Sequence, residues 1–285
     1  MQTSYLGSRQ AVLRNWQNPD GGWGYFRGKA SRLEPTAYAT MVLAGEPAAE
    51  RAWSLLKTWQ GADGGWRPAA QVSTAGWGTA LCVTLGISRN DWSDPVRKGT
   101  NWLVETSGVE SEWLSVFLTR FRKERDYTLK AWPWQPGNSG WVEPTAHALV
   151  ALKKAKTKFN SKDLQERLRM GEAQLLDVRS SDGGWNYGSR EALGEALPSY
   201  PETTALGLLG LQGYKGLEGA FATAEKQMQT TPSPLARAWL TVAARLHAVS
   251  SAELKGDPGN DIMIMAVEAL AVAEGNFHFL KTENW

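Results

Sequence analysis

A short signature centred on tryptophan recurs four times and constrains the fold more than any other feature of this chain. The copies read QNPDGGW, QGADGGW, QPGNSGW and RSSDGGW, and they end at Trp23, Trp66, Trp141 and Trp185. Each has Gln or Arg six residues before the Trp, Asp or Asn three residues before it, and Gly directly before it. A signature that recurs in this way predicts a repeat architecture with one supersecondary unit per repeat.

A second signature follows each copy and begins an apolar run. It reads EPTA at 34–37, WGTA at 77–80, EPTA at 143–146 and ETTA at 202–205. The first two repeats share one register, because Asp20 and Asp63 are 43 residues apart, and so are Thr36 and Thr79. This length is typical of stacked helical hairpins.

Turn residues and apolar periodicity divide the chain into twelve expected helices. They lie near 3–17, 36–45, 46–59, 77–87, 95–106, 112–124, 144–156, 161–176, 202–213, 216–229, 233–249 and 261–273. Outer and inner helices alternate, and 112–124 is expected to be an inner one. We therefore predict an all-α fold, an (α/α)6 toroid of about six hairpins, as one domain over residues 1–285. The long loop 186–201 is expected to be functional.

These signatures resemble the QW repeats of the terpene cyclase and protein prenyltransferase superfamily, whose members share an α/α toroid. The resemblance covers most of the chain. It implies a class II-type, proton-initiated terpene or meroterpenoid cyclase that acts on a linear polyprenyl substrate in the central cavity. It also implies that the reaction needs no cofactor and no metal.

Class II terpene cyclases carry the acid that donates the proton in an Asp-x-Asp-Asp-Thr-Ala-like motif. Aligned on Thr-Ala, that acid corresponds to Glu202, and in the other repeats to Glu143 and Glu34. All three are Glu instead of Asp and lack the flanking carboxylates. A neighbouring carboxylate helps to hold a proton on its partner, so burial alone would have to do this. The ordinary alternative is that these residues only stabilise helix N-termini.

In a helical ring, the N-termini of the inner helices point at one mouth of the cavity. Glu34, Trp77, Glu143 and Glu202 are therefore expected around one pocket. His147 lies one helical turn after Glu143, where it either orients the acid or is simply a buried, hydrogen-bonded histidine.

Aromatic and basic residues complete the expected site. Aromatic rings that line a cavity stabilise carbocations, although most such rings are ordinary core. The candidates are Trp77, Trp113, Trp239, Tyr38 and Phe117, with Tyr187 from the long loop. Basic residues at the mouth are expected to hold a polar head group, or else to be solvated surface charges. They are Arg27, Arg32 and Arg190.

The balance of 31 Lys and Arg against 29 Asp and Glu argues against nucleic acid as a partner. The single cysteine, Cys82, excludes an intramolecular disulfide and suits a reducing compartment. No signal peptide or membrane span is evident. We expect a cytoplasmic protein with a peripheral membrane contact for isoprenoid delivery. The large cyclases that it resembles have two toroidal domains and this chain has length for one, so a partner or a homodimer is expected.

Three other functions remain open. A zinc prenyltransferase is disfavoured, because Ala80 stands two residues before Cys82 and the three histidines show no ligand spacing. A glycan-cleaving (α/α)6 enzyme would use paired carboxylates and tryptophan platforms. The strongest competitor is a non-catalytic toroid that binds an isoprenoid or a protein.

Overall fold

The computed structural model describes residues 2–111, 113–119, 126–249, 254, 259–273 and 279–282. Its helices are α1 (Gln2–Asn15), α2 (Leu33–Val42), α3 (Pro47–Thr58), α4 (Gly78–Ser88), α5 (Asp94–Glu105), α6 (Trp113–Thr119), α7 (Val142–Ala155), α8 (Lys162–Asp177), α9 (Pro201–Gly210), α10 (Glu218–Thr230), α11 (Pro234–Leu246) and α12 (Ile262–Val272). A 3-10 helix η1 (Val109–Ser111) precedes α6, and the strands β1 (Glu191–Ala192) and β2 (Glu195–Ala196) form a small antiparallel hairpin.

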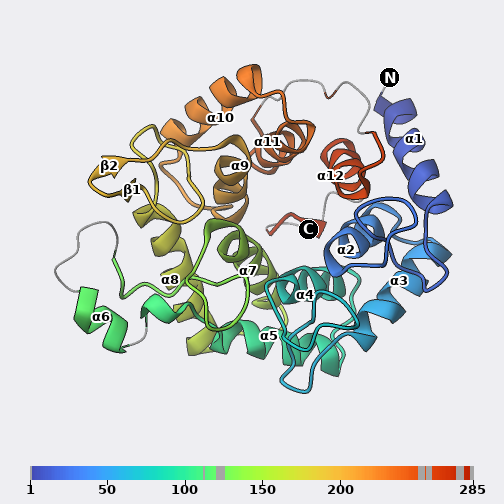
Figure 1. The fold of residues 1–285 in the computed structure, drawn as a ribbon, viewed down its shortest axis with the longest axis horizontal. Helices are drawn as coiled ribbons and strands as arrows, with labels where there is room; N and C mark the ends of the chain where they lie inside the picture. Colours follow the sequence, from blue (N-terminus) through green and yellow to red (C-terminus); the bar gives the residue numbers. More distant parts are fainter. Residues whose placement is uncertain are drawn as a thin grey trace.

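Six inner helices form a closed ring in the order α2, α4, α7, α9, α11 and α12, with α12 packing back against α2 (Figure 1). The inner helices α2, α4 and α9 are apolar almost all round and buried nearly throughout, as expected for helices packed on both sides. The helices α1, α3, α5, α8 and α10 lie outside them. The predicted all-α toroid is confirmed.

In each of four repeats, a buried tryptophan ties an outer helix to the inner helix that follows it. The indole Nε1 donates to a leucine carbonyl in the last turn of the outer helix, and the backbone N–H donates to a threonine hydroxyl in the first turn of the inner helix. The sets are Leu13–Trp23–Thr36, Leu56–Trp66–Thr79, Leu103–Trp132–Thr145 and Leu175–Trp185–Thr204. Since the last carbonyls of a helix lack partners within it, each indole satisfies one of them.

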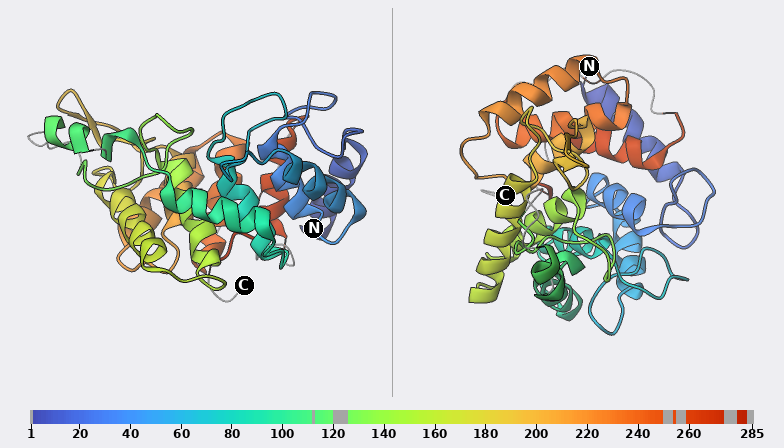
Figure 2. Two further views of the ribbon diagram at one scale, coloured as in Figure 1. Left: turned by 90° about the horizontal axis from the view of Figure 1, so that it is seen from below. Right: turned by 60° about the vertical axis from the view of Figure 1, so that its left-hand side comes forward.

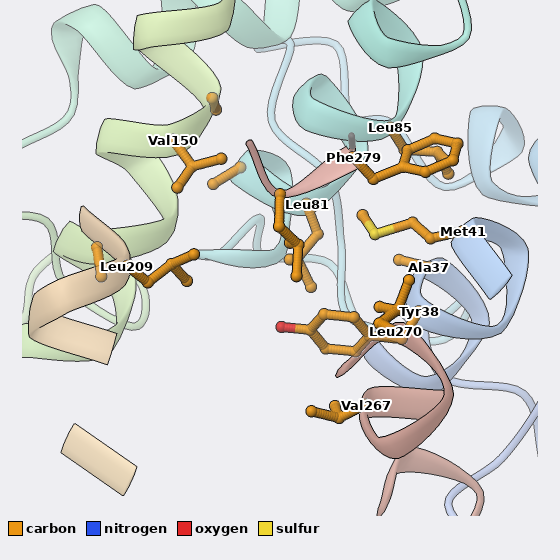
Figure 3. Close-up of a cluster of buried hydrophobic side chains, with 14 of the residues drawn as sticks. Ala37, Tyr38, Met41, Leu81, Leu85, Val150, Leu209, Val267, Leu270 and Phe279 are labelled. Atoms are coloured by element: carbon orange, nitrogen blue, oxygen red, sulfur yellow. The ribbon is translucent and has the colours of Figure 1, made fainter. Parts of the chain in front are cut away.

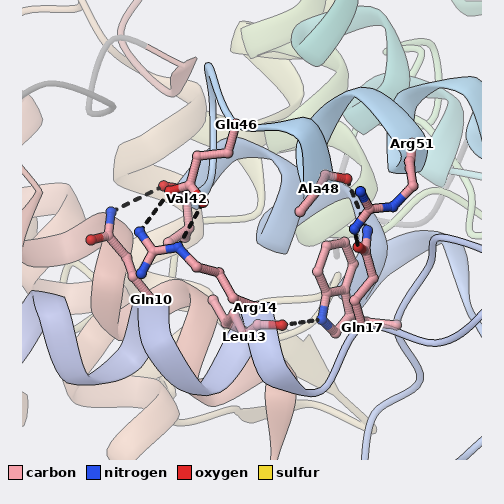
Figure 4. A network of polar contacts seen from close by, with 9 residues as sticks. Gln10, Leu13, Arg14, Gln17, Val42, Glu46, Ala48 and Arg51 are labelled. Atoms are coloured by element: carbon pink, nitrogen blue, oxygen red, sulfur yellow. Dashed lines mark hydrogen bonds and ion pairs between the residues drawn. The ribbon is translucent and has the colours of Figure 1, made fainter.

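In the first two repeats, the glutamine of the signature also connects one outer helix to the next. Gln17 Nε2 donates to the Ala48 carbonyl at 2.8 Å, and Gln60 Nε2 donates to the Pro95 carbonyl at 2.7 Å. Each acceptor is the second residue of the next outer helix. Figure 4 shows Gln17 between Ala48 and Arg51, whose guanidinium donates to the Gln17 side-chain oxygen.

The start of an inner helix is also bonded to the loop of the neighbouring repeat. The acceptor is the carbonyl two residues after that repeat's anchoring tryptophan. The pairs are Leu33 N to Pro68 O, Trp77 N to Trp134 O, Val142 N to Tyr187 O and Ile262 N to Tyr25 O. The last pair links the final helix of the ring to the first repeat, so it closes the circle.

The predicted register of the third repeat was wrong. Trp141 is 37% exposed and stands just before α7, whereas Trp132 makes both anchoring hydrogen bonds. Trp132 and Thr145 are 13 residues apart, as Trp23 and Thr36 are. The 135–141 copy therefore matches the signature in sequence, but its tryptophan does not occupy the anchoring position of the fold.

The expected inner helix at 112–124 was also wrong. The helix α6 lies outside the ring, and α4 packs directly on α7 (Figure 1). Trp113 is 80% exposed and Phe117 is 53% exposed, so neither lines the cavity as predicted. Residues 112 and 120–124 lie outside the described residues. Of the helices outside the ring in the described part of the chain, α1, α3, α5, α8 and α10 pack on inner helices and α6 packs on η1, so the predicted count of six hairpins is not confirmed.

The axis of the ring is filled by side chains. Figure 3 shows Tyr38 and Met41 from α2, Leu81 from α4 and Leu209 from α9 converging with Phe279 of the C-terminal segment, and all five are buried. In the left view of Figure 2, the loops that lead into α2 and α4, the β1–β2 hairpin and α6 lie on one side of the ring. We call this side the mouth.

Candidate functional site

The mouth brings together the glutamates that begin three inner helices. Burial raises the pKa of Glu143 to about 8, and the negative charges of Glu34 and Glu202 add to this effect. At neutral pH Glu143 is therefore mostly protonated. Glu202 accepts a hydrogen bond from Ser233 Oγ at 3.2 Å. The three carboxyl groups belong to three different repeats, and the closed ring places their charges within reach of one another.

Glu34 is paired with a tyrosine from the preceding loop. Tyr25 Oη donates to Glu34 Oε2 at 2.5 Å. Burial raises the pKa of Glu34, the Tyr25 hydrogen bond opposes that rise, and the charge of Asp261 adds to it. Burial also raises the pKa of Tyr25, with the Glu34 charge as the next cause, so the phenol keeps its proton.

His147 faces the centre of the ring. Its Nε2 and Tyr38 Oη share a hydrogen bond of 3.2 Å, which fits the second predicted alternative, a buried and hydrogen-bonded histidine. Burial lowers the pKa of His147 to about 3, and the imidazole is therefore neutral. Tyr38 and His147 lie one turn beyond Glu34 and Glu143, so the hydrogen bond shows that the first turns of α2 and α7 face each other across the ring.

An aromatic cluster lies around His147. The ring centroid of His147 is 5.3 Å from that of Trp77 and 5.8 Å from that of Trp239, and Tyr38 lies 5.6 Å from Trp239. Trp134 packs edge-on against Trp77 at 5.2 Å. Three of the predicted lining residues, Tyr38, Trp77 and Trp239, are thus brought together.

A pocket of about 530 Å³ opens at the mouth beside this cluster. It is lined mainly by apolar groups, and Glu34, Tyr25, Arg32, Trp77 and Trp134 form part of its wall. Of the four residues expected around one pocket, Glu34 and Trp77 line it, whereas Glu143 and Glu202 are not among its lining residues. The pocket lies beside the starts of α2 and α4, because the ring axis itself is packed.

The other predicted residues lie elsewhere or at the rim. The Arg27 guanidinium lies 5.7 Å from the ring centroid of Trp16, and Arg190 bonds the Asp177 carbonyl and pairs with its carboxylate. Arg32 alone of the three predicted basic residues lines the pocket. Tyr187 is half-exposed between Trp141 and Tyr200.

Two pocket residues, Tyr25 and Trp134, were missing from the sequence prediction. Both stand two residues after an anchoring tryptophan, as Tyr187 does. The Trp-x-Tyr pattern was visible at Tyr25 and Tyr187, but the third-repeat register hid Trp134. The spacing of 13 residues from Trp132 to Thr145 is the signal that would have revealed it.

In the part of the chain that the structure describes, no group of three or more His, Cys, Asp or Glu side chains has an arrangement suited to a metal ion. The helices within those same ranges include none with the length and apolar character of a membrane span.

No protein-family model and no curated protein matches this chain. Among solved structures, the type II terpene cyclase MstE from Scytonema matches with 16% identity over 95% of this chain and 97% of that chain, at a TM-score of 0.58. A variant of MstE in complex with its substrate geranylgeranyl dihydroxybenzoate matches at a TM-score of 0.60, with 16% identity over 95% of this chain and 96% of that one. A family 8 endoglucanase from Klebsiella pneumoniae matches with 14% identity over 94% and 97%, at 0.58. At these identities the likeness establishes the fold: the chain has the (α/α)-toroid architecture of MstE.

Proposed function

We propose that this protein is a proton-initiated, class II-type terpene or meroterpenoid cyclase that acts on a linear polyprenyl substrate. The observation that carries the proposal is that Glu34, Glu143 and Glu202 begin three inner helices at one mouth, beside an aromatic cluster. Burial, with the charges of Glu34 and Glu202, raises the pKa of Glu143 to about 8, which favours its protonated form. The likeness in fold to MstE, whose structure was solved with geranylgeranyl dihydroxybenzoate as substrate, supports it.

Glu143 is the acid that this arrangement favours, in place of Glu202, which the sequence ranked first. The sequence lacks flanking carboxylates around each glutamate, but Glu34 and Glu202 supply negative charge to Glu143 from other repeats. Like charges disfavour ionisation of a neighbour, so the proton stays on Glu143 until an alkene accepts it.

The proposed reaction conserves the mass of the substrate. The Glu143 proton adds to one alkene carbon, the cation forms on the neighbouring carbon, and a second alkene attacks it to close a ring. Loss of a proton from the last cation ends the sequence. Trp77, Trp239 and Tyr38 would stabilise the cations through their ring faces, by about 2 kcal/mol for a desolvated contact.

Product analysis by mass spectrometry tests this proposal. Purified protein with farnesol, geranylgeraniol and geranylgeranyl dihydroxybenzoate, in the presence of a chelator, should yield isomers of the substrate. Glu143→Gln should lower their formation by about 10²–10⁴-fold, the range for loss of a general acid. The matched control is Glu218→Gln, an exposed first-turn glutamate on the outer helix α10, which should retain activity. Full activity of Glu143→Gln would refute the assignment of the acid.

We further propose that the mouth rim contacts an anionic membrane surface from which the substrate enters. The rim bears exposed apolar side chains on the first loop, on α6, on the loop before β1 and on the β1–β2 hairpin. They are Tyr25, Phe26, Trp113, Leu114, Phe117, Tyr187 and Leu193. Aromatic side chains favour the membrane interface. The first loop also carries Arg27 and Lys29, whose charge suits anionic head groups.

A glycan-cleaving activity is the second candidate, because the family 8 endoglucanase shares the fold and the mouth holds several carboxyl groups. Release of reducing ends from a panel of β-glucans and mannans, lost in Glu34→Gln and Glu143→Gln, would favour it over the cyclase.

A further inference from the structure

Tyr25 is held at the mouth by both its backbone and its side chain. Its backbone carbonyl accepts a hydrogen bond from Ile262 N at 2.8 Å, at the point where the ring closes. Its hydroxyl donates to Glu34 at 2.5 Å, which is at the short end for an O–H···O bond to a carboxylate. Both Tyr25 and Glu34 line the pocket. The phenol is therefore held in place by the architecture of the ring and points at one carboxyl.

Glu34 and Glu143 occupy the same position in two repeats that face each other. One turn further along their helices, Tyr38 and His147 are joined by a hydrogen bond across the ring. The charge of Glu34 raises the pKa of Glu143, and the charge of Glu143 acts on both Tyr25 and Tyr38. The two carboxyl groups are therefore electrostatically coupled. They belong to repeats that are distant in the sequence, since Tyr38 and His147 are 109 residues apart.

We propose that Tyr25 is a positioning residue that favours the ionised form of Glu34, and that this negative charge keeps the proton on Glu143. The inference rests on the proposed function, in which Glu143 donates that proton. A hydrogen bond to a carboxylate stabilises its charged form, and one ionised carboxylate disfavours ionisation of its neighbour. In this proposal Glu34 is the anionic partner and Glu143 is the acid.

The other charged and titratable groups around the pair modulate this coupling. Asp261, at the start of α12, raises the pKa of Glu34, and Glu202, from α9, adds to the rise at Glu143. The positive charge of Arg32 opposes the rise in the pKa of Tyr25. Tyr38 and the neutral His147 lie on the two helices that carry the pair.

The test measures ionisation of Glu143 directly, so that it does not depend on turnover. Carbon-13 labelled glutamate is introduced, the carboxyl signal of Glu143 is assigned by its loss in Glu143→Gln, and its chemical shift is followed against pH. Tyr25→Phe should lower the titration midpoint of Glu143 by roughly one pH unit, because Glu34 then loses its stabilising donor and takes up a proton more readily. Tyr214→Phe, an exposed tyrosine after α9, is the matched control and should leave the midpoint unchanged.

A double variant decides whether Tyr25 acts through Glu34. In a Glu34→Gln background, Tyr25→Phe should cause no further shift of the Glu143 midpoint. An unchanged midpoint in Tyr25→Phe, or an equal shift without Glu34, would overturn the inference. Circular dichroism confirms that each variant is folded. If the shift is seen but no isoprenoid is cyclised, the coupling stands and the proposed function fails.

Discussion

Replacement of Trp132 by Phe is expected to destabilise the ring strongly, although the repeat signature of this stretch ends at Trp141 and not at Trp132. The Trp132 side chain is 2% exposed, and its Nε1 donates to the Leu103 carbonyl at 2.8 Å. The Arg167 guanidinium lies 3.8 Å from its ring centroid. Phenylalanine fits the site but has no donor and leaves space behind.

The cost has two parts. A buried carbonyl without its partner costs about 1–3 kcal/mol. A smaller ring in a site closed by Gly171 and Leu149 adds roughly 1 kcal/mol, because the surroundings relax only in part. We expect Trp132→Phe to lose about 2–4 kcal/mol of unfolding free energy. Trp66→Phe, at the same position of the second repeat, should lose less, because the Leu56 carbonyl keeps a hydrogen bond from Trp59 N at 3.0 Å.

Trp141→Phe is the matched comparison, because Trp141 is 37% exposed and stands outside the anchoring position. Its expected cost is below about 1 kcal/mol. Equilibrium urea denaturation followed by far-UV circular dichroism measures all three variants. A Trp141→Phe variant that is as unstable as Trp132→Phe would refute the assignment of Trp132 as the third anchor.

Two further predictions concern the mouth. The pKa of Glu143 is raised from 4.5 to about 8 in the folded protein, so the native state binds this proton more tightly than the unfolded chain does. Its contribution to stability is therefore complete below pH 4.5 and is lost as the pH rises to about 8. Urea denaturation across that range should show stability falling with pH, and a flatter profile for Glu143→Gln; parallel profiles would contradict this. Separately, the double variant Trp113→Ser/Phe117→Ser should weaken sedimentation with phosphatidylserine vesicles by at least about tenfold, since two large apolar side chains leave the interface. The control pair Phe159→Ser/Tyr214→Ser removes exposed aromatic residues near the C-terminal ends of inner helices, and equal losses in both pairs would argue against a membrane-binding mouth.

The sequence alone determined the toroid and the register of three of its four tryptophan signatures. The Asp-Gly-Gly-Trp turn is local, because Asp20, Asp63 and Asp182 each accept from the N–H of the glycine two residues on. The preceding glycine in the first of these turns has φ of 92°, which a residue with a Cβ rarely adopts. Local interactions of this kind, and helices formed by long apolar runs, can be predicted from the amino-acid sequence.

Only the tertiary structure decided the rest. The apolar run at Trp113 satisfies the same periodicity as an inner helix, but α4 and α7 pack on each other and leave no place for it in the ring. The carboxyl groups of Glu34, Glu143 and Glu202 acquire their coupling when the ring closes, through contacts such as that between Ile262 N and Tyr25 O. Hydrophobic periodicity specifies which face of a segment is buried, but not which neighbour buries it, and the ionisation of a carboxyl depends on that neighbour.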